Sequence, residues 1–202
     1  TFGVEFEVCI PHDGIAQERI RVGGYHCGCQ VPALPAGWNA QADGSIQAPA
    51  GFAGVEVVSP ILKGADGIKQ VAAICEWFAR IGAKVNRSTG FHVHVGFAGD
   101  NDALARLVTL VAANEKALFA VTGTHSREQG HYCSGIQNHP QHQRCFRDKT
   151  AAASLQALQR YHVLNLVNLL TNRQPTVEFR VFAGTTNATK AQVIAVVNAA
   201  VA

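Results

Sequence analysis

The sequence predicts an α+β protein in which helices pack on one face of an antiparallel β-sheet and leave the other face open to a ligand. Two observations predict this class. Four short segments alternate apolar and polar side chains with the period of a β-strand. The helical segments between them do not follow the regular strand–helix alternation that a Rossmann or TIM-barrel sheet requires.

The first of these segments lies at the start of the chain and defines the pattern. Val4, Phe6 and Val8 form one apolar face of the predicted strand. Glu5 and Glu7 stand next to each other on the opposite face. Two neighbouring carboxylates are unfavourable unless a cation holds them together. From this segment alone, a solvated outer face is the simpler interpretation.

Three further segments repeat the same arrangement of one apolar face and one charged face. The charged residues on them are Glu56, then His92 and His94, and finally Glu178 and Arg180. One such strand carries little information. Four of them predict a single sheet that lines a charged cleft.

A turn signal before the second acidic strand adds one more carboxylate. Asp43, Gly44 and Ser45 are typical of a hairpin turn. We therefore expect Asp43 and Glu56 to lie on neighbouring segments. A short strand is predicted at 19–22, and the loop after it is rich in glycine and proline.

Four helices are predicted from apolar residues at the helical period. Asp66 begins the first helix and Gly82 ends it, while Asp100 or Asn101 caps the second. The remaining two cover 151–170 and the residues after 189. Residues 122–149 are polar and too long for a simple connection, which predicts a lid-like loop over a ligand.

Composition restricts the function classes. The chain has 202 residues, of which 48% are hydrophobic and 15% charged, and this is typical of one folded domain over 1–202. No apolar run could span a bilayer, and the net charge of +3 is too dispersed to indicate a nucleic-acid partner. We expect a cytoplasmic protein whose two ends are trimmed from a longer chain.

Six cysteines divide into two kinds. Cys9 and Cys75 lie in apolar periodic segments and are predicted to be core residues. Cys27 and Cys29 follow His26 in a glycine-rich loop, and with either of two distant cysteines they could bind zinc. Those distant residues are Cys133 and Cys145. The spacing is unusual for zinc, so ordinary reduced thiols are the alternative.

The charged face indicates metal and phosphate chemistry. Carboxylates in a cleft need cations to remain ionised, and oxygen-rich sites suit Mg²⁺ or Mn²⁺. An arginine such as Arg180 can stabilise a phosphoryl group that is being transferred. Alternatively, Arg180 only neutralises Glu178, and one residue of the His92/His94 pair is a structural histidine. Four further arginines are interpreted as solvated: Arg87, Arg127, Arg144 and Arg147. The three in the 122–149 loop could alternatively guide an anionic substrate.

Six strings in order along the chain carry a family resemblance. They are Gly3–Glu7, Gly37–Trp38 with Asp43–Ser45, Glu56–Pro60, Gly90–Gly96, Arg160–Leu166 and Thr176–Phe182. Together they resemble the amidoligases, carboxylate–amine ligases related to glutamate–cysteine ligase and glutamine synthetase. The resemblance implies a fold of that kind. It also implies ATP- and Mg²⁺-dependent formation of an amide or peptide bond through an acyl phosphate, with release of ADP and phosphate.

The resemblance also implies roles for individual residues. The metal-binding acids are Glu5, Glu7, Asp43, Glu56 and Glu178. His94, in preference to His92, is a further metal ligand or a contact to the nucleotide phosphates. Arg180 faces the phosphoryl group and, with Glu178, forms the catalytic pair. The substrates are a small-molecule or peptide carboxylate and an amine, and the oligomeric state is left open.

Two other functions fit the same strings. A His-x-His strand can present imidazoles to zinc in a metal-dependent hydrolase, although the element order lacks the repeated βα units of such barrels. A nucleotide-binding module without turnover is the second alternative. The intact acids Glu5, Glu7, Asp43, Glu56 and Glu178 argue against it.

Overall fold

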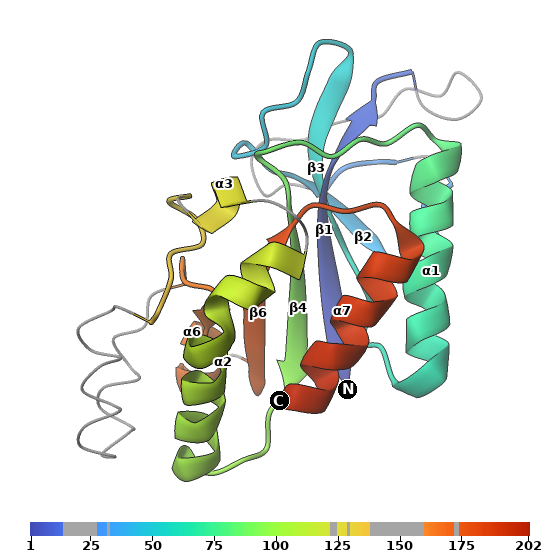
Figure 1. Cartoon of the computed structure of the whole chain (residues 1–202). Helices are drawn as coiled ribbons and strands as arrows, with labels where there is room; N and C mark the ends of the chain where they lie inside the picture. Colours follow the sequence, from blue (N-terminus) through green and yellow to red (C-terminus); the bar gives the residue numbers. More distant parts are fainter. Residues whose placement is uncertain (14–27, 32, 122–124, 129, 138–159, 172–173) are drawn as a thin grey trace. The chain divides into compact units, whose positions relative to one another are not determined.

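The computed structural model describes residues 1–13, 28–31, 33–121, 125–128, 130–137, 160–171 and 174–202. These form two compact units, residues 1–91 with 184–196 and residues 92–183 with 197–202. Antiparallel strand pairs and helices occur in one chain (Figure 1), so the predicted α+β class is confirmed. Within the described residues, no helix combines the length and the apolar character that crossing a bilayer requires.

The first unit is built on three strands. They are β1 (Phe2–Pro11), β2 (Asn39–Ala42) and β3 (Phe52–Val58), in the order β2-β3-β1 with both pairs antiparallel. The register places Glu56 on β3 directly opposite Glu7 on β1 and Gln41 on β2. Three polar side chains therefore form one row across the sheet of this unit.

Helices cover the apolar side of these strands. Phe6 of β1 is fully buried, and its ring packs edge-on against Phe78 of α1 (Gly64–Arg80) with 5.3 Å between the ring centroids. α7 (Ala188–Val201) lies beside α1 (Figure 1), where Gln192 Nε2 donates to the carbonyl oxygen of Ile68 at 3.1 Å. Since successive strand residues alternate faces, Glu5 and Glu7 project away from these helices.

A close backbone approach fixes the turn before β3. A Cβ atom on Gly54 would lie 2.7 Å from Cβ of Ile46 and 3.1 Å from the carbonyl oxygen of Asp43. Real Cβ atoms do not approach other atoms so closely, so only glycine lets the 43–46 turn fold onto β3. The predicted proximity of Asp43 to the Glu56 strand is confirmed.

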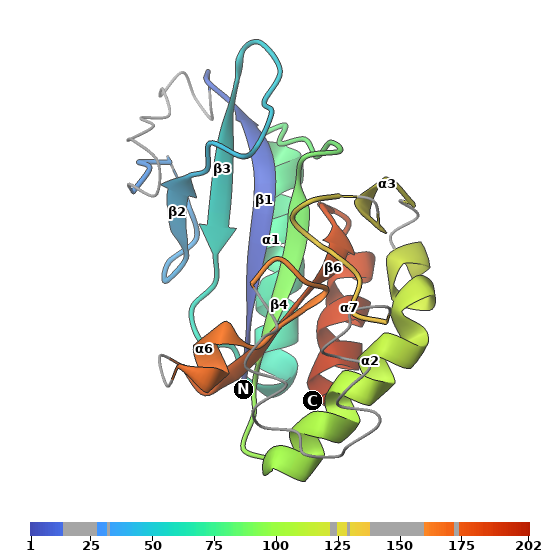
Figure 2. The same cartoon turned by 90° about the vertical axis from the view of Figure 1, so that its left-hand side faces the viewer.

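The second unit contains most of β4 (Gly90–Gly96), whose first two residues belong to the first unit, together with β5 (Leu164–Asn165) and β6 (Thr176–Ala183). The strand order is β4-β6-β5. α2 (Asn101–Val121) packs against β6 (Figure 2), and Asp100 Oδ1 accepts a hydrogen bond from Ala103 N at its start. The short helices are α3 (His125–Glu128) and α6 (Val167–Leu170).

The helix predicted at 151–170 is wrong over 160–166 and confirmed over 167–170, which form α6. Residues 160–166 were expected to be helical, but Leu164 and Asn165 form β5 and pair with Phe179 and Glu178 of β6. A short buried apolar run fits a strand as well as a helix, and here the neighbouring β6 decides the outcome. Residues 151–159, the strand predicted at 19–22 and residues 138–149 of the lid-like loop lie outside the described residues.

Candidate functional site

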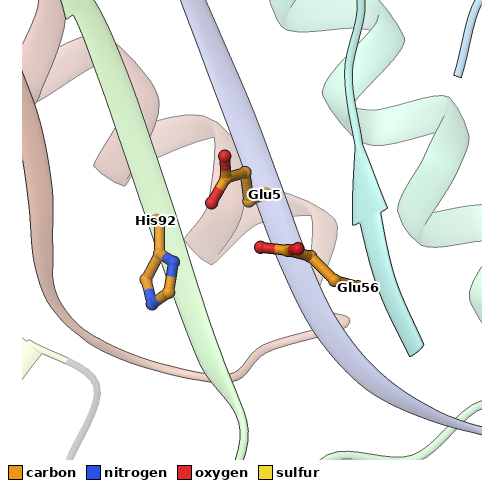
Figure 3. Close-up of side chains that lie close together, drawn as sticks. All are labelled: Glu5, Glu56 and His92. Atoms are coloured by element: carbon orange, nitrogen blue, oxygen red, sulfur yellow. The ribbon is translucent and has the colours of Figure 1, made fainter. Parts of the chain in front are cut away.

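The first unit brings two of the predicted acids together. Glu5 on β1 is the diagonal neighbour of Glu56 on β3, because Glu56 lies directly opposite Glu7. The two side chains reach toward each other (Figure 3), and each offers a carboxylate oxygen within 4.8 Å of the other. Gln41 Nε2 donates to Glu56 Oε2 at 2.8 Å from the other side. His92, labelled in the same view, is described with the second unit.

This crowding changes the proton affinity of Glu56. Burial raises the pKa of its carboxyl from 4.5 to about 8, and the charge and hydrogen bond of Glu5 and the charge of Glu7 act in the same direction. The Gln41 amide opposes the shift, but its effect is smaller. Without a cation, Glu56 therefore keeps its proton at neutral pH and shares it with Glu5.

Glu7 and Asp43 have backbone partners. Glu7 is buried, and its Oε2 accepts a hydrogen bond from the N–H of Gly90, where β4 begins. Asp43 Oδ1 accepts a hydrogen bond from Ser45 N at 2.8 Å, which closes the turn that the sequence predicted. Each of these carboxylates therefore uses one oxygen to hold the local backbone.

The second unit holds a carboxylate of a different kind. Glu178 on β6 is buried, and its Oε1 accepts a hydrogen bond from Nη1 of Arg180 in a close ion pair. Asn165 Nδ2 donates to Oε2 of the same carboxylate. Asn165 Oδ1 also accepts a hydrogen bond from Val167 N at 2.9 Å, so this residue joins β6 to the start of α6.

The two histidines of β4 lie on the same side of this pair. His92 Nδ1 is 3.6 Å from Glu178 Oε1 and 3.5 Å from Arg180 Nη1. His94 Nε2 is 3.9 Å from the same Oε1. Four residues that the sequence predicted on one charged face, His92, His94, Glu178 and Arg180, thus come together within this unit.

Sequence reasoning missed two residues of this cluster. Arg127 on α3 was interpreted as solvated, but it is half-buried and its Nη2 lies 3.3 Å from His92 Nε2. Cys133 is buried, and its thiol donates to the carbonyl oxygen of Arg180 at 3.2 Å. Neither residue belongs to a periodic or motif-like string, so the sequence offered no signal for them.

A further buried acid supports the segment that carries these residues. Glu115 of α2 accepts hydrogen bonds from the backbone N–H groups of Ile136 and Gln137. A Cβ on Gly135 would lie 2.4 Å from Glu115 Oε1, so glycine is needed where the segment crosses the carboxylate. Glu115 therefore acts as an anchor for residues 135–137.

Comparison with known proteins identifies the family. The model of a family described as "Putative amidoligase enzyme" matches residues 1–202, which is the whole chain. The chain belongs to this amidoligase family. No curated protein and no solved structure matches it significantly.

This membership confirms the family predicted from the six strings. It also supports the general prediction that the protein is a ligase. The match includes the acids of both units. The individual roles assigned to Glu5, Glu7, Asp43, Glu56, His94 and Glu178 stay predictions.

The predictions for the cysteines have different outcomes in the structure. Cys9 and Cys75 are buried core residues, as predicted. Cys29 lies beside β2, where its N–H donates to the carbonyl oxygen of Ala40 at 2.8 Å. Cys27 and Cys145 lie outside the described residues, so zinc at the Cys27/Cys29 loop stays a prediction.

Proposed function

We propose that this amidoligase is an ATP- and Mg²⁺-dependent ligase that joins a carboxylate to an amine through an acyl phosphate. The observation that carries the proposal is the Glu5–Glu56 pair. Two carboxylates that share a proton at neutral pH form a site that a divalent cation can occupy when it displaces that proton. Family membership supports the reaction class.

The donor set fits a hard cation. Glu5 and Glu56 offer carboxylate oxygens within 4.8 Å of each other, and such oxygens suit Mg²⁺ or Mn²⁺ better than zinc. We assign Glu7 and Asp43 as further metal ligands within the first unit, and Glu178 and His94 as metal ligands within the second. Asp43 would bind through the oxygen that its hydrogen bond with Ser45 N does not use. When bound, Mg²⁺ neutralises phosphate oxygens of ATP.

The residues of the second unit have separate tasks in this proposal. The substrate carboxylate attacks the γ-phosphorus, the bond to the ADP oxygen breaks, and Arg180 stabilises the charge that spreads over the phosphoryl oxygens. The amine then attacks the acyl carbon, phosphate leaves, and the amine gives up a proton. Glu178 orients Arg180 through their ion pair. The family match covers the residues of both clusters.

ATP turnover in the presence of pooled amino acids and peptides tests the proposal. We expect ADP and phosphate as products, and hydroxylamine should trap the acyl phosphate as a hydroxamate when the right carboxylate is present. AMP as the nucleotide product would contradict the mechanism. Tightly bound zinc with amide hydrolysis that needs no ATP would support the hydrolase alternative instead.

A further inference from the structure

Arg127 has contacts that a solvated surface arginine does not form. Its Nε and Nη2 donate to the carbonyl oxygen of Arg180 at 3.3 and 3.2 Å, and Nη2 also lies 3.3 Å from His92 Nε2. These three residues come from α3, β6 and β4 of the second unit. One guanidinium therefore connects the backbone of Arg180 to the imidazole beside Glu178.

The contact with Arg127 selects a tautomer of His92. A guanidinium has only N–H donors, so the Nε2 atom that faces it must accept. In the neutral ring the proton then resides on Nδ1. This atom is 3.6 Å from Glu178 Oε1, an acceptor, and 3.5 Å from Arg180 Nη1, a donor. The N–H of His92 then lies beside both groups, and the shorter contact of Arg127 with Nε2 decides the tautomer.

The segment that carries Arg127 is fixed at several points. The N–H of Gly130 donates to the carbonyl oxygen of Arg127 at 2.9 Å. Cys133 donates to the same Arg180 carbonyl that Arg127 contacts, and Glu115 holds the N–H groups of Ile136 and Gln137. Arg127 is therefore presented to His92 by a supported segment.

We propose that Arg127 is a positioning residue that holds His92 with its proton on Nδ1 and thereby orients the Glu178–Arg180 pair. The catalytic part of this inference rests on the proposed ligase function. Because Nε2 of His92 accepts from Arg127 and Nδ1 carries the proton, neither ring nitrogen offers a lone pair to a metal. The metal role that the sequence divided between the two histidines of β4 falls to His94.

The first test needs no substrate. ¹⁵N–¹H correlation spectra of histidine-labelled protein at about pH 8.5, above the ordinary pKa of histidine, show which ring nitrogen carries the proton. His92→Gln assigns the signal. We expect Nδ1–H in the wild-type protein and a mixture of tautomers in Arg127→Met. A proton on Nε2 of wild-type His92 would overturn the proposal, whatever the protein catalyses.

The second test uses ATP turnover. Arg127→Met should lower kcat by about 10- to 100-fold, typical for loss of a supporting partner, while the KM for ATP changes less than about 3-fold. Arg127→Lys keeps the positive charge but lacks the planar guanidinium fork. Its kcat should therefore lie between those of the wild type and Arg127→Met. Arg106→Met is the matched control, since Arg106 is exposed on α2, and it should keep full activity.

A double variant shows whether Arg127 acts through His92. We expect the Arg127→Met, His92→Gln protein to be no slower than His92→Gln alone. Rate losses that multiply would show an independent role and overturn the proposal. If the wild-type protein shows no ATP turnover, the ligase function fails, while the tautomer measurement still decides the link between Arg127 and His92.

Discussion

The two units contain acidic clusters that stabilise their buried carboxyl groups in opposite ways. In the first unit, Glu56 lies beside two other acids and one amide, and the pKa of its carboxyl rises to about 8. In the second unit, Glu178 is deeper, but a guanidinium and an amide contact its two oxygens. A buried carboxylate is stable when it keeps a proton or when it has a cation. In the proposed function, the first cluster takes its cation from solution.

The largest expected effect is the loss of ATP turnover when Arg180, the cationic partner of Glu178, is removed. Arg180→Ala should slow ATP turnover by about 10³-fold with a small change in the KM for ATP, because the guanidinium acts mainly on the transferring phosphoryl group. Product formation measured under saturating ATP tests this. Arg106→Ala, exposed on α2, serves as the control. A normal rate in Arg180→Ala would remove Arg180 from the mechanism.

The same substitution should also destabilise the second unit. Glu178 would remain buried without its guanidinium partner, which typically costs about 3–5 kcal/mol. Replacing both partners, Glu178→Leu with Arg180→Met, should recover much of the free energy of unfolding and none of the turnover. Denaturant melts of the single and double variants separate stability from catalysis.

The metal-free first unit should become less stable as pH rises. The pKa of Glu56 is about 8 in the folded protein and 4.5 in the unfolded chain. Between these two pH values, the folded state therefore holds a proton that the unfolded state has released. Its contribution is fully present below about pH 4.5 and is lost progressively up to about pH 8. Glu56→Gln should remove this slope and stabilise the chelator-treated protein at pH 8 by a few kcal/mol, on the order set by the shift.

Thermal melts between pH 5 and pH 9 with a chelator present measure this slope. Glu76→Gln is the matched control, because Glu76 is exposed on α1, and it should keep the wild-type slope. A Glu56→Gln protein that melts below the wild type at pH 8 would show that Glu56 is ionised and stabilised by other groups.

Glu115 represents a third way to bury a carboxylate, through backbone N–H groups. Glu115→Gln should lower the free energy of unfolding by about 1–3 kcal/mol, since two hydrogen bonds to a charged acceptor become weaker. Gly135→Ala should have a similar effect, because its Cβ would collide with Oε1. Hydrogen exchange at Ile136 and Gln137 that does not change in either variant would contradict the anchoring role.

The smallest effect on stability is expected at Asp43. An asparagine oxygen can accept the hydrogen bond from Ser45 N as the aspartate does, so Asp43→Asn should change the free energy of unfolding by less than about 0.5 kcal/mol. If Asp43 is a ligand, Mg²⁺ affinity should still fall by about 10-fold. Unchanged affinity would mean that Asp43 only shapes the turn.

The strands and their acids could be predicted because a period of two separates the faces within a few residues. Phe6 and Glu7 are assigned to opposite faces by neighbouring residues alone, and the buried Phe6 confirms it. α1 and α2 could be predicted for the same local reason, from apolar periodicity and, for α2, from the cap at Asp100. The start predicted for α1 at Asp66 is wrong, because the helix begins at Gly64 and Asp66 lies inside its first turn. Local patterns thus specify most elements in the described part of the chain.

The partners within each cluster could not be predicted, because they depend on contacts between distant segments. Arg127 and Arg180 are 53 residues apart, and Glu115 meets backbone groups about 20 residues later. The apolar residues before Asn165 are compatible with helix and strand, and their pairing with β6 decides between them. No local pattern encodes such pairings.

The most direct test of the account is the number of protons released when Mg²⁺ or Mn²⁺ binds. Calorimetric titration at pH 7 in two buffers with different ionisation enthalpies gives this number. Because the pKa of Glu56 is about 8 without metal and a ligand carboxylate must be ionised, we predict release of nearly one proton per cation. Glu56→Gln should abolish that release and weaken binding. Binding without proton release, or no binding at millimolar metal, would contradict the claim that the Glu5–Glu56 pair is a cation site.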